Sequence, residues 1–162
     1  MDYNTLSSNA FTFTINRLPQ TVFRVVSMNL PGITVSPVES GQPEGDQYFP
    51  GSSNNFEELQ MTFIVDENLL NYEELYNWIT QQQYKTEYKA KNTEEALLTS
   101  DGVFVTMTNS SVPNRVFSFR DMFPISLSSL NFDTRESNPD PVTCQVTFKF
   151  SYFTFQPKSL LY

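Results

Sequence analysis

The 162-residue sequence lacks histidine altogether, which excludes the commonest general base and the usual partner of a catalytic serine. Zinc sites that contain histidine are excluded for the same reason. The single cysteine, Cys144, cannot form a disulfide within the chain, and we expect it to be a small buried hydrophobic residue. The five glycines match neither a Walker loop nor a dinucleotide-binding loop. We therefore predict no catalytic residues, no cofactor and no enzymatic activity.

Basic residues are scarce: 10 Lys and Arg stand against 18 Asp and Glu, for a net charge of −8. A surface of this charge lacks the basic groove that binds nucleic acid through its phosphates. No window approaches the roughly 20 apolar residues of a membrane span, and the first ten residues lack the basic and apolar regions of a signal peptide. We expect a soluble protein without membrane contact.

Carboxylates remain as candidates for catalysis or metal binding. They occur in adjacent pairs, whose side chains diverge on a strand or helix, so we interpret them as solvated surface. The pairs are Glu57–Glu58, Glu73–Glu74 and Glu94–Glu95. Asp133, Glu136 and Asp140 share a turn-rich stretch but lack the spacing and central glycine of a calcium loop. We predict no metal site.

What the sequence does contain is aromatic residues, with 15 Phe, 8 Tyr and 1 Trp. A chain of this length buries roughly 70% of its unfolded surface when it folds as one unit. The aromatic residues supply ample core for that unit. We predict a single domain over residues 1–162.

Alternation of apolar and polar residues marks the stretch 142–152, and side chains of a strand point alternately to opposite faces. The apolar face comprises Val142, Cys144, Val146, Phe148, Phe150 and Tyr152. The polar face comprises Thr143, Gln145, Thr147, Lys149 and Ser151. One packed and one solvated face is typical of antiparallel sheets.

Two other stretches share this design. Residues 11–16 set Phe11, Phe13 and Ile15 against Thr12, Thr14 and Asn16. Residues 58–65 set Leu59, Met61, Phe63 and Val65 against Glu58, Gln60 and Thr62. Further strands are predicted at 22–30, as a hairpin with the first, and at 102–108, 115–120 and 125–132. The pattern predicts a mainly β fold, an antiparallel β-barrel or sandwich.

One helix is predicted, over residues 67–84. Tyr72, Leu75, Tyr76 and Ile79 have the spacing of one helical face, and Asp66 or Asn68 can cap the start. Trp78 lies beside this stripe, and we interpret it as a core anchor rather than a ligand-stacking residue. A short helical turn is predicted between Asn92 and Leu98.

Prolines and glycines crowd residues 31–55, which cannot be a helix or a central strand throughout. We predict a long arm that becomes ordered against a partner; a loose surface loop is the alternative. Its apolar residues favour the first, because large apolar groups prefer burial. The arm residues are Ile33, Val35, Val38, Glu39, Glu44, Asp46, Tyr48 and Phe49.

The order of these segments resembles the tail tube proteins of contractile-tailed bacteriophages, from about residue 9 to residue 155. The resemblance rests on Leu30-Pro31-Gly32 before the arm and on the junction at Asp66-Glu67 before the aromatic helix. It also rests on the Phe123-Pro124 step before the closing strands.

The resemblance implies a structural virion protein, assembled in the bacterial cytoplasm, whose hexameric rings stack into the inner tail tube. DNA passes through without specific binding, and the tail sheath and the baseplate or neck proteins are the other partners. The implied channel lining is Thr12, Thr14, Asn16, Glu58, Gln60, Thr62, Thr143, Gln145 and Thr147. Lys149 departs from such a lining, and the arm is expected to reach the adjacent ring.

Three alternatives remain. A tube-fold ring of the baseplate or neck has the same architecture, and so does the inner tube of a contractile injection or secretion system. A monomeric β-sandwich binding module, with the arm as its capture loop, is the non-viral alternative. Assembly into rings separates the first two readings from the third.

Overall fold

The computed structural model describes residues 6, 8–18, 24–41, 47–87, 98–135 and 140–156. Its elements follow the predicted mainly β pattern, with antiparallel pairing throughout the described strands. In chain order they are β1 (Phe11–Ile15), β2 (Arg24–Met28), β3 (Ile33–Val35), β4 (Val38–Ser40), β5 (Gln47–Phe49), β6 (Asn54–Phe56), β7 (Leu59–Ile64), α1 (Leu70–Glu87), β8 (Ser100–Met107), β9 (Pro113–Leu127), β10 (Thr143–Lys149) and β11 (Tyr152–Gln156).

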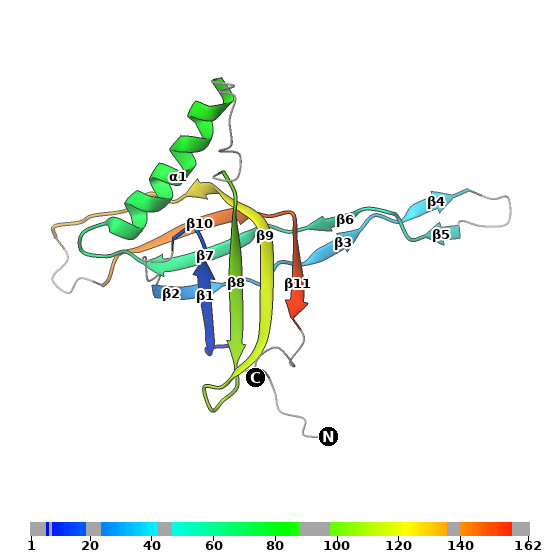
Figure 1. Cartoon of the computed structure of the whole chain (residues 1–162), viewed down its shortest axis with the longest axis horizontal. Helices are drawn as coiled ribbons and strands as arrows, with labels where there is room; N and C mark the ends of the chain where they lie inside the picture. Colours follow the sequence, from blue (N-terminus) through cyan, green and yellow to red (C-terminus); the bar gives the residue numbers. More distant parts are fainter. Residues whose placement is uncertain are drawn as a thin grey trace.

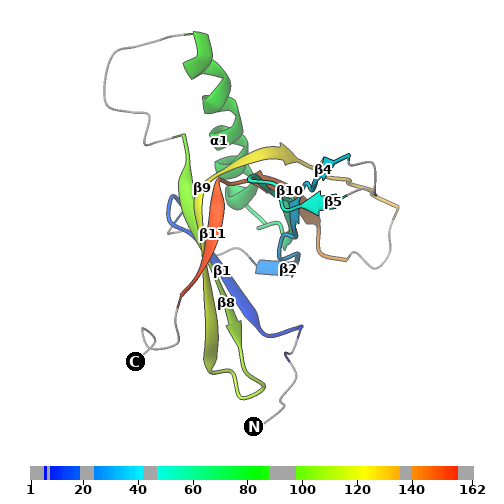
Figure 2. The ribbon, with the colours of Figure 1, turned by 90° about the vertical axis from the view of Figure 1, so that its right-hand side faces the viewer.

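The main sheet has the strand order β1-β8-β9-β10-β7-β2, and β11 pairs with β9 beside β10. It consists of two parts whose strands cross (Figure 1). We call β1, β8, β11 and residues 113–120 of β9 the blade, and β2, β7, β10 and residues 123–127 of β9 the base. The view turned by 90° in Figure 2 shows the blade and the base lying next to each other.

The strand β9 connects the two parts, and this corrects the sequence prediction. Separate strands were expected at 115–120 and 125–132, but one strand runs through both and ends at Leu127. Asp121 lies at the change of direction with a positive φ of 53°. The Asp101 carboxylate holds this bend, because it pairs with the Arg120 guanidinium and accepts a 3.3 Å hydrogen bond from the Asp121 N–H.

The predicted strand 142–152 is likewise divided. Strand β10 pairs with the base part of β9, and after Phe150 and Ser151 the chain turns and continues as β11 along the same edge of β9. The alternation holds through Phe150, which packs against the core, but Tyr152 is 48% exposed and lies on the face opposite to Phe153. The turn at Ser151 follows the bend of β9, so the two strands bend together.

The predicted hairpin between residues 11–16 and 22–30 is wrong. Strand β1 pairs with β8, and β2 pairs with β7, at opposite ends of the strand order. Local turn chemistry suggested the pairing, but the apolar face of β1 is matched by Phe104 of β8, which only the tertiary fold brings beside it. The predicted turn at 109–114 does form the β8–β9 hairpin, with Thr108 N–H bonded to the Val112 carbonyl at 2.8 Å.

The core lies between the blade, the base and α1. The blade contributes Phe13, Ile15, Phe104, Phe117 and Phe119, and residue Met122 follows at the bend. The base contributes Leu59, Met61, Phe63, Cys144, Val146 and Phe148, and α1 contributes Leu75 and Trp78. Cys144 is 1% exposed, as predicted. Because both parts of the sheet turn their apolar faces to one core, their polar faces point away from it in different directions.

The helix begins at Leu70, somewhat later than predicted, and its buried face is shifted. Asn71, Leu75 and Trp78 are buried, whereas Tyr76, expected on the apolar stripe, is 54% exposed. Asn71 joins the helix start to β7, because its side chain donates to the Ile64 carbonyl and accepts from the Asp66 N–H. Most of the turn predicted at 92–98 lies outside the described residues.

The arm is a long β-hairpin built of two short ladders. Strand β3 pairs with β6 near the body, and β4 pairs with β5 farther out. Figure 1 shows it extending away from the sheet beyond β11. Between the ladders, a Cβ on Gly51 would lie 2.1 Å from the Ser36 carbonyl oxygen, so only glycine permits this approach of the two strands.

Candidate assembly surfaces

The base carries a polar face in which six of the predicted lining residues come together. Gln145 lies opposite Thr62, and Thr147 lies opposite Gln60, across the β10–β7 pair. The Gln145 amide donates to the Gln60 side-chain oxygen at 3.4 Å. The full set is Glu58, Gln60, Thr62, Thr143, Gln145 and Thr147.

Two residues of this face differ from a freely solvated lining. Thr147 is only 9% exposed, contrary to prediction, because it lies between Gln60 of β7 and Ser126 of β9. Lys149, whose positive charge departs from the predicted lining, forms an ion pair with Glu58, with Nζ 3.7 Å from Oε1. The face is therefore a laterally bonded polar layer with its one lysine neutralised.

The other three predicted lining residues are on the blade. Thr12 and Thr14 are exposed on the outward face of β1, opposite Val105 and Val103 of β8, and Asn16 follows. The same face includes Ser118, whose hydroxyl accepts a 2.9 Å hydrogen bond from Gln156 of β11. Since the blade and the base share a core, these three residues belong to a separate surface from the six on the base.

Two edges of the blade have no paired strand in the described part of the chain, that of β1 and that of β11. Their sequences, FTFTI and YFTFQ, contain no charge and no proline. Charges, prolines and bulges are the usual protections of an open edge. By contrast, β2 at the other end of the sheet carries Arg24 and a bulge between Val25 and Ser27. The blade edges are the unprotected ones.

The edge at β11 was not among the residues predicted to be functional. The alternation of residues 152–156 was a usable signal for it, since Phe153 and Phe155 share one face and Tyr152, Thr154 and Gln156 share the other. The sequence prediction ends one continuous strand at residue 152, whereas the structure begins the separate strand β11 there.

The arm presents apolar side chains that nothing in the described part of the chain covers. Val38 and Phe49 lie opposite each other on one face of the outer ladder, and Glu39 and Tyr48 lie on the other. Val38, Tyr48 and Phe49 are 57%, 64% and 51% exposed. Ile33 and Val35 of β3 are exposed in the same way, and Glu44 and Asp46 lie outside the described residues.

The arm is anchored to the sheet at the point where it leaves the body. Phe56 of β6 packs on Phe150 and Phe153, with ring centres 5.6 Å apart in both contacts. Gly32 and Glu57 exchange hydrogen bonds, through the Glu57 N–H at 3.0 Å and the Glu57 carboxylate at 3.3 Å. These contacts fix the direction in which the hairpin leaves the body.

The polar groups on and beside α1 help to pack the helix against the rest of the protein. The Arg17 guanidinium stacks 5.0 Å from the centre of the Trp78 ring and donates to Gln81 at 2.8 Å, and burial lowers its pKa. Trp78 donates its indole N–H to the Leu98 carbonyl at 2.9 Å, which confirms its role as an anchor. Partial burial also raises the pKa of Glu74, and the charges of Asp66 and Glu73 add to the effect.

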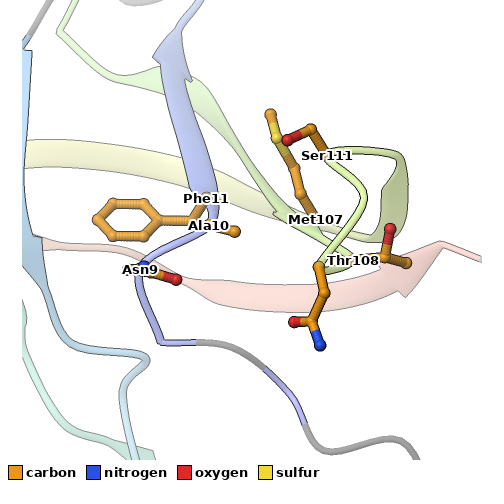
Figure 3. A pocket seen from close by; sticks show the side chains of 7 residues that line it. Asn9, Ala10, Phe11, Met107, Thr108 and Ser111 are labelled. Carbon is orange, nitrogen blue, oxygen red and sulfur yellow. The ribbon is translucent and has the colours of Figure 1, made fainter.

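No small-molecule site emerges among the described residues. The hollow at the free end of the blade has about 480 Å³ and is lined by residues including Phe11, Met107 and Thr108. Figure 3 shows the Phe11 ring directed away from Met107, so these side chains do not converge on a common point. The described residues gather no group of three His, Cys, Asp or Glu able to hold a metal, and their helix is not long and apolar enough to cross a membrane.

Comparison with known families gives one match. The model of the phage tail tube protein family matches residues 4–156, which confirms the resemblance predicted from the sequence. No curated protein sequence matches the chain.

Solved structures resemble the fold along nearly its whole length. A chain of the sheath/tube terminator of the PVC extracellular contractile injection system superposes with a TM-score of 0.69 at 16% identity, covering 97% of this chain and 100% of that one. The tube-terminating cap of the anti-feeding prophage gives 0.65 at 17%, over 96% and 93%. A chain of the anti-feeding prophage baseplate gives 0.60 at 13%, over 96% and 97%. At these identities the likeness shows a common fold.

Proposed function

The chain belongs to the phage tail tube protein family, and from that membership we propose that it forms hexameric rings that stack into the inner tube of a contractile tail. DNA passes through this tube during ejection without specific binding. We propose further that residues 1–162 act as one tube-fold unit. The family match and the near-complete superposition on tube-associated chains support this reading.

The pair of unprotected blade edges is the observation that carries the proposal. Successive strands of the blade alternate in direction, so β1 and β11 run antiparallel to each other. When β11 of one copy pairs with β1 of the next, the alternation continues into the neighbour. The two edges are different surfaces, and such a head-to-tail contact closes into a ring when the rotation permits. Closure also removes both open edges.

The channel lining follows from that arrangement. In a ring joined through blade edges, the blade faces of all copies form one continuous surface, and its core side is already covered by the base and α1. The outward face, with Thr12, Thr14 and Asn16, is then left to line the channel. Small polar groups and a negative protein charge let a polyanion pass without adhesion. We assign the six polar residues of the base to the outside of this barrel.

The arm is proposed to contact the adjacent ring. It lies beyond the sheet, it is anchored at Phe56, and its exposed apolar residues gain by burial against another copy. The tail sheath and the baseplate or neck proteins are the proposed partners of the assembled tube. Assembly in the host cytoplasm is part of the same proposal.

A ring at the end of the tube is the second candidate, because three of the similar structures are of a terminator, a cap and a baseplate. A fourth, equally similar structure is of a sheath-tube complex and agrees with a subunit of the main tube. A terminal ring has the same lateral joints but stacks on one side only. An inner tube of an injection system is a third candidate that differs in cargo.

The test is negative-stain electron microscopy of the purified protein across a concentration series, with light scattering for small assemblies. Stacked hollow tubes support a tube subunit, and single rings that never elongate support the terminal ring. A monomer at every concentration contradicts the proposal and favours a binding module.

A further inference from the structure

An aromatic row crosses all four strands of the blade. In register, Phe13 of β1 lies beside Phe104 of β8, then Phe117 of β9, then Phe155 of β11. The rings of Phe104 and Phe117 are 5.6 Å apart, and those of Phe117 and Phe155 are 4.8 Å apart. Three members are less than 10% exposed, but Phe155 at the edge is 62% exposed.

The backbone groups at the two edges can be identified from the hydrogen bonds inside the blade. Asn16 N–H bonds to the Asp101 carbonyl and Met107 N–H to the Ala10 carbonyl, each at 2.9 Å. Even-numbered residues of β1 therefore bond to β8, and because backbone groups alternate in direction, Phe11, Phe13 and Ile15 turn theirs to the open edge. The β8–β9 and β9–β11 registers extend this alternation across the blade. The backbone N–H and C=O groups of Phe153 and Phe155 therefore face the open edge of β11.

The two edges therefore match in backbone and side chain together. Residues directly opposite in an antiparallel ladder carry their side chains on the same face. The free backbone groups of both edges belong to residues whose side chains lie on the core face: Phe11, Phe13 and Ile15 on β1, and Phe153 and Phe155 on β11. Pairing them brings the apolar side chains of the two edges together and sets Thr154 of β11 beside a threonine of β1.

Resting on the proposed ring, we propose that Phe155 packs against Phe11 of the adjacent copy, with Phe153 opposite Phe13. Strands of a closed barrel are tilted, which requires a stagger between neighbouring units. A direct continuation of the row sets Phe155 against Phe13 without any stagger. A shift of two residues along β1 sets Phe155 against Phe11. Phe11 is only partly buried, so it has exposed surface that the neighbouring copy can cover. This register gives two aromatic pairs at each joint.

Disulfide cross-linking tests the register. The variant F11C/F155C, in a C144A background, places cysteines at residues whose Cα atoms lie roughly 5.5 Å apart in a hydrogen-bonded pair, within disulfide range. Mild oxidation is expected to give a ladder of covalent oligomers that ends at the ring size. In the control T12C/F155C, the first cysteine is on the opposite face, and the ladder should be nearly absent.

The outcomes separate this joint from the function on which it rests. F11C/F155C is therefore oxidised at a protein concentration at which it forms rings under reducing conditions. Such rings without a ladder on oxidation, or equal ladders in both variants, overturn the joint and leave the ring standing. Absence of wild-type rings overturns both.

A second measurement needs no cysteine. F155A is expected to raise the concentration needed for ring formation by about tenfold or more, since a buried phenylalanine is lost at every joint. F132A is the control, because Phe132 is 74% exposed and lies outside the blade. Equal effects of the two variants contradict the proposal, and thermal melts establish that both are folded.

Discussion

Asp121 shows how one residue sets the shape of the sheet. It has a positive φ where β9 passes from the blade to the base, and Asp101 holds its N–H. Aspartate tolerates this conformation, whereas a β-branched residue does not. We expect Asp121→Val to lower the free energy of unfolding by about 1–3 kcal/mol and Asp121→Gly to change it little.

Urea denaturation measures both changes. Ser126→Val is the control, because Ser126 is an exposed residue of the same strand without a positive φ. Equal losses for Asp121→Val and Ser126→Val show that the bend imposes no backbone strain.

Glu74 gives a prediction for pH. Burial, helped by Asp66 and Glu73, raises its pKa in the folded protein above that in the unfolded chain. The folded state therefore binds more protons between these two pKa values, and stability falls as the pH rises through that interval. Glu74→Gln removes this loss, so it should raise Tm at neutral pH and have little effect below the ordinary pKa of glutamate.

Thermal melts across pH measure that difference. Glu39→Gln, which removes one exposed carboxylate of the arm, serves as the control for the loss of a negative charge. A Tm gain for Glu74→Gln that is the same at every pH assigns the effect to something other than the ionisation of Glu74.

At the scale of the element, the helix tests which face is buried. Trp78 is 1% exposed, packs near Phe148 and bonds to the Leu98 carbonyl, while Tyr76 is solvent-exposed. Trp78→Ala is expected to cost about 3–5 kcal/mol of unfolding free energy, and Tyr76→Ala much less than 1. Chemical denaturation of the monomer measures both, and a large loss for Tyr76→Ala contradicts the shifted face.

The arm is the second element with a separable role. Replacing residues 37–50 by Asn-Gly removes the outer ladder, and the two-residue turn then joins Ser36 and Gly51, which lie close together. The inner ladder and the Phe56 anchor remain. We expect single rings that do not stack, observed by electron microscopy, with an unchanged melt of the monomer. Tubes of normal length from this variant exclude the arm from stacking.

For the whole molecule, charge governs assembly. Each copy carries a net charge of −8, so copies repel one another as they associate. Added salt screens this repulsion, with a Debye length near 10 Å at 0.1 M. We expect sodium chloride to lower the concentration at which light scattering detects rings. Assembly that weakens with salt indicates joints dominated by ion pairs, contrary to the uncharged blade edges.

The sequence alone determined the fold class, the buried faces of β1, β7 and β10, and the single arm. These features depend on a period of two and on the positions of proline and glycine, which are local properties. The family resemblance was also readable, because it rests on the order of such segments.

Apart from the β8–β9 hairpin, only the tertiary structure decided which strands pair, where β9 bends, and which face of α1 is buried. Nothing in the sequence singles out Phe104 among the aromatic residues as the neighbour of β1. Packing of the whole core determines that pairing. The same holds for the open edges: an edge is a property of the sheet, and the uncharged sequences of β1 and β11 acquire their meaning only where no other strand of the described chain lies beside them.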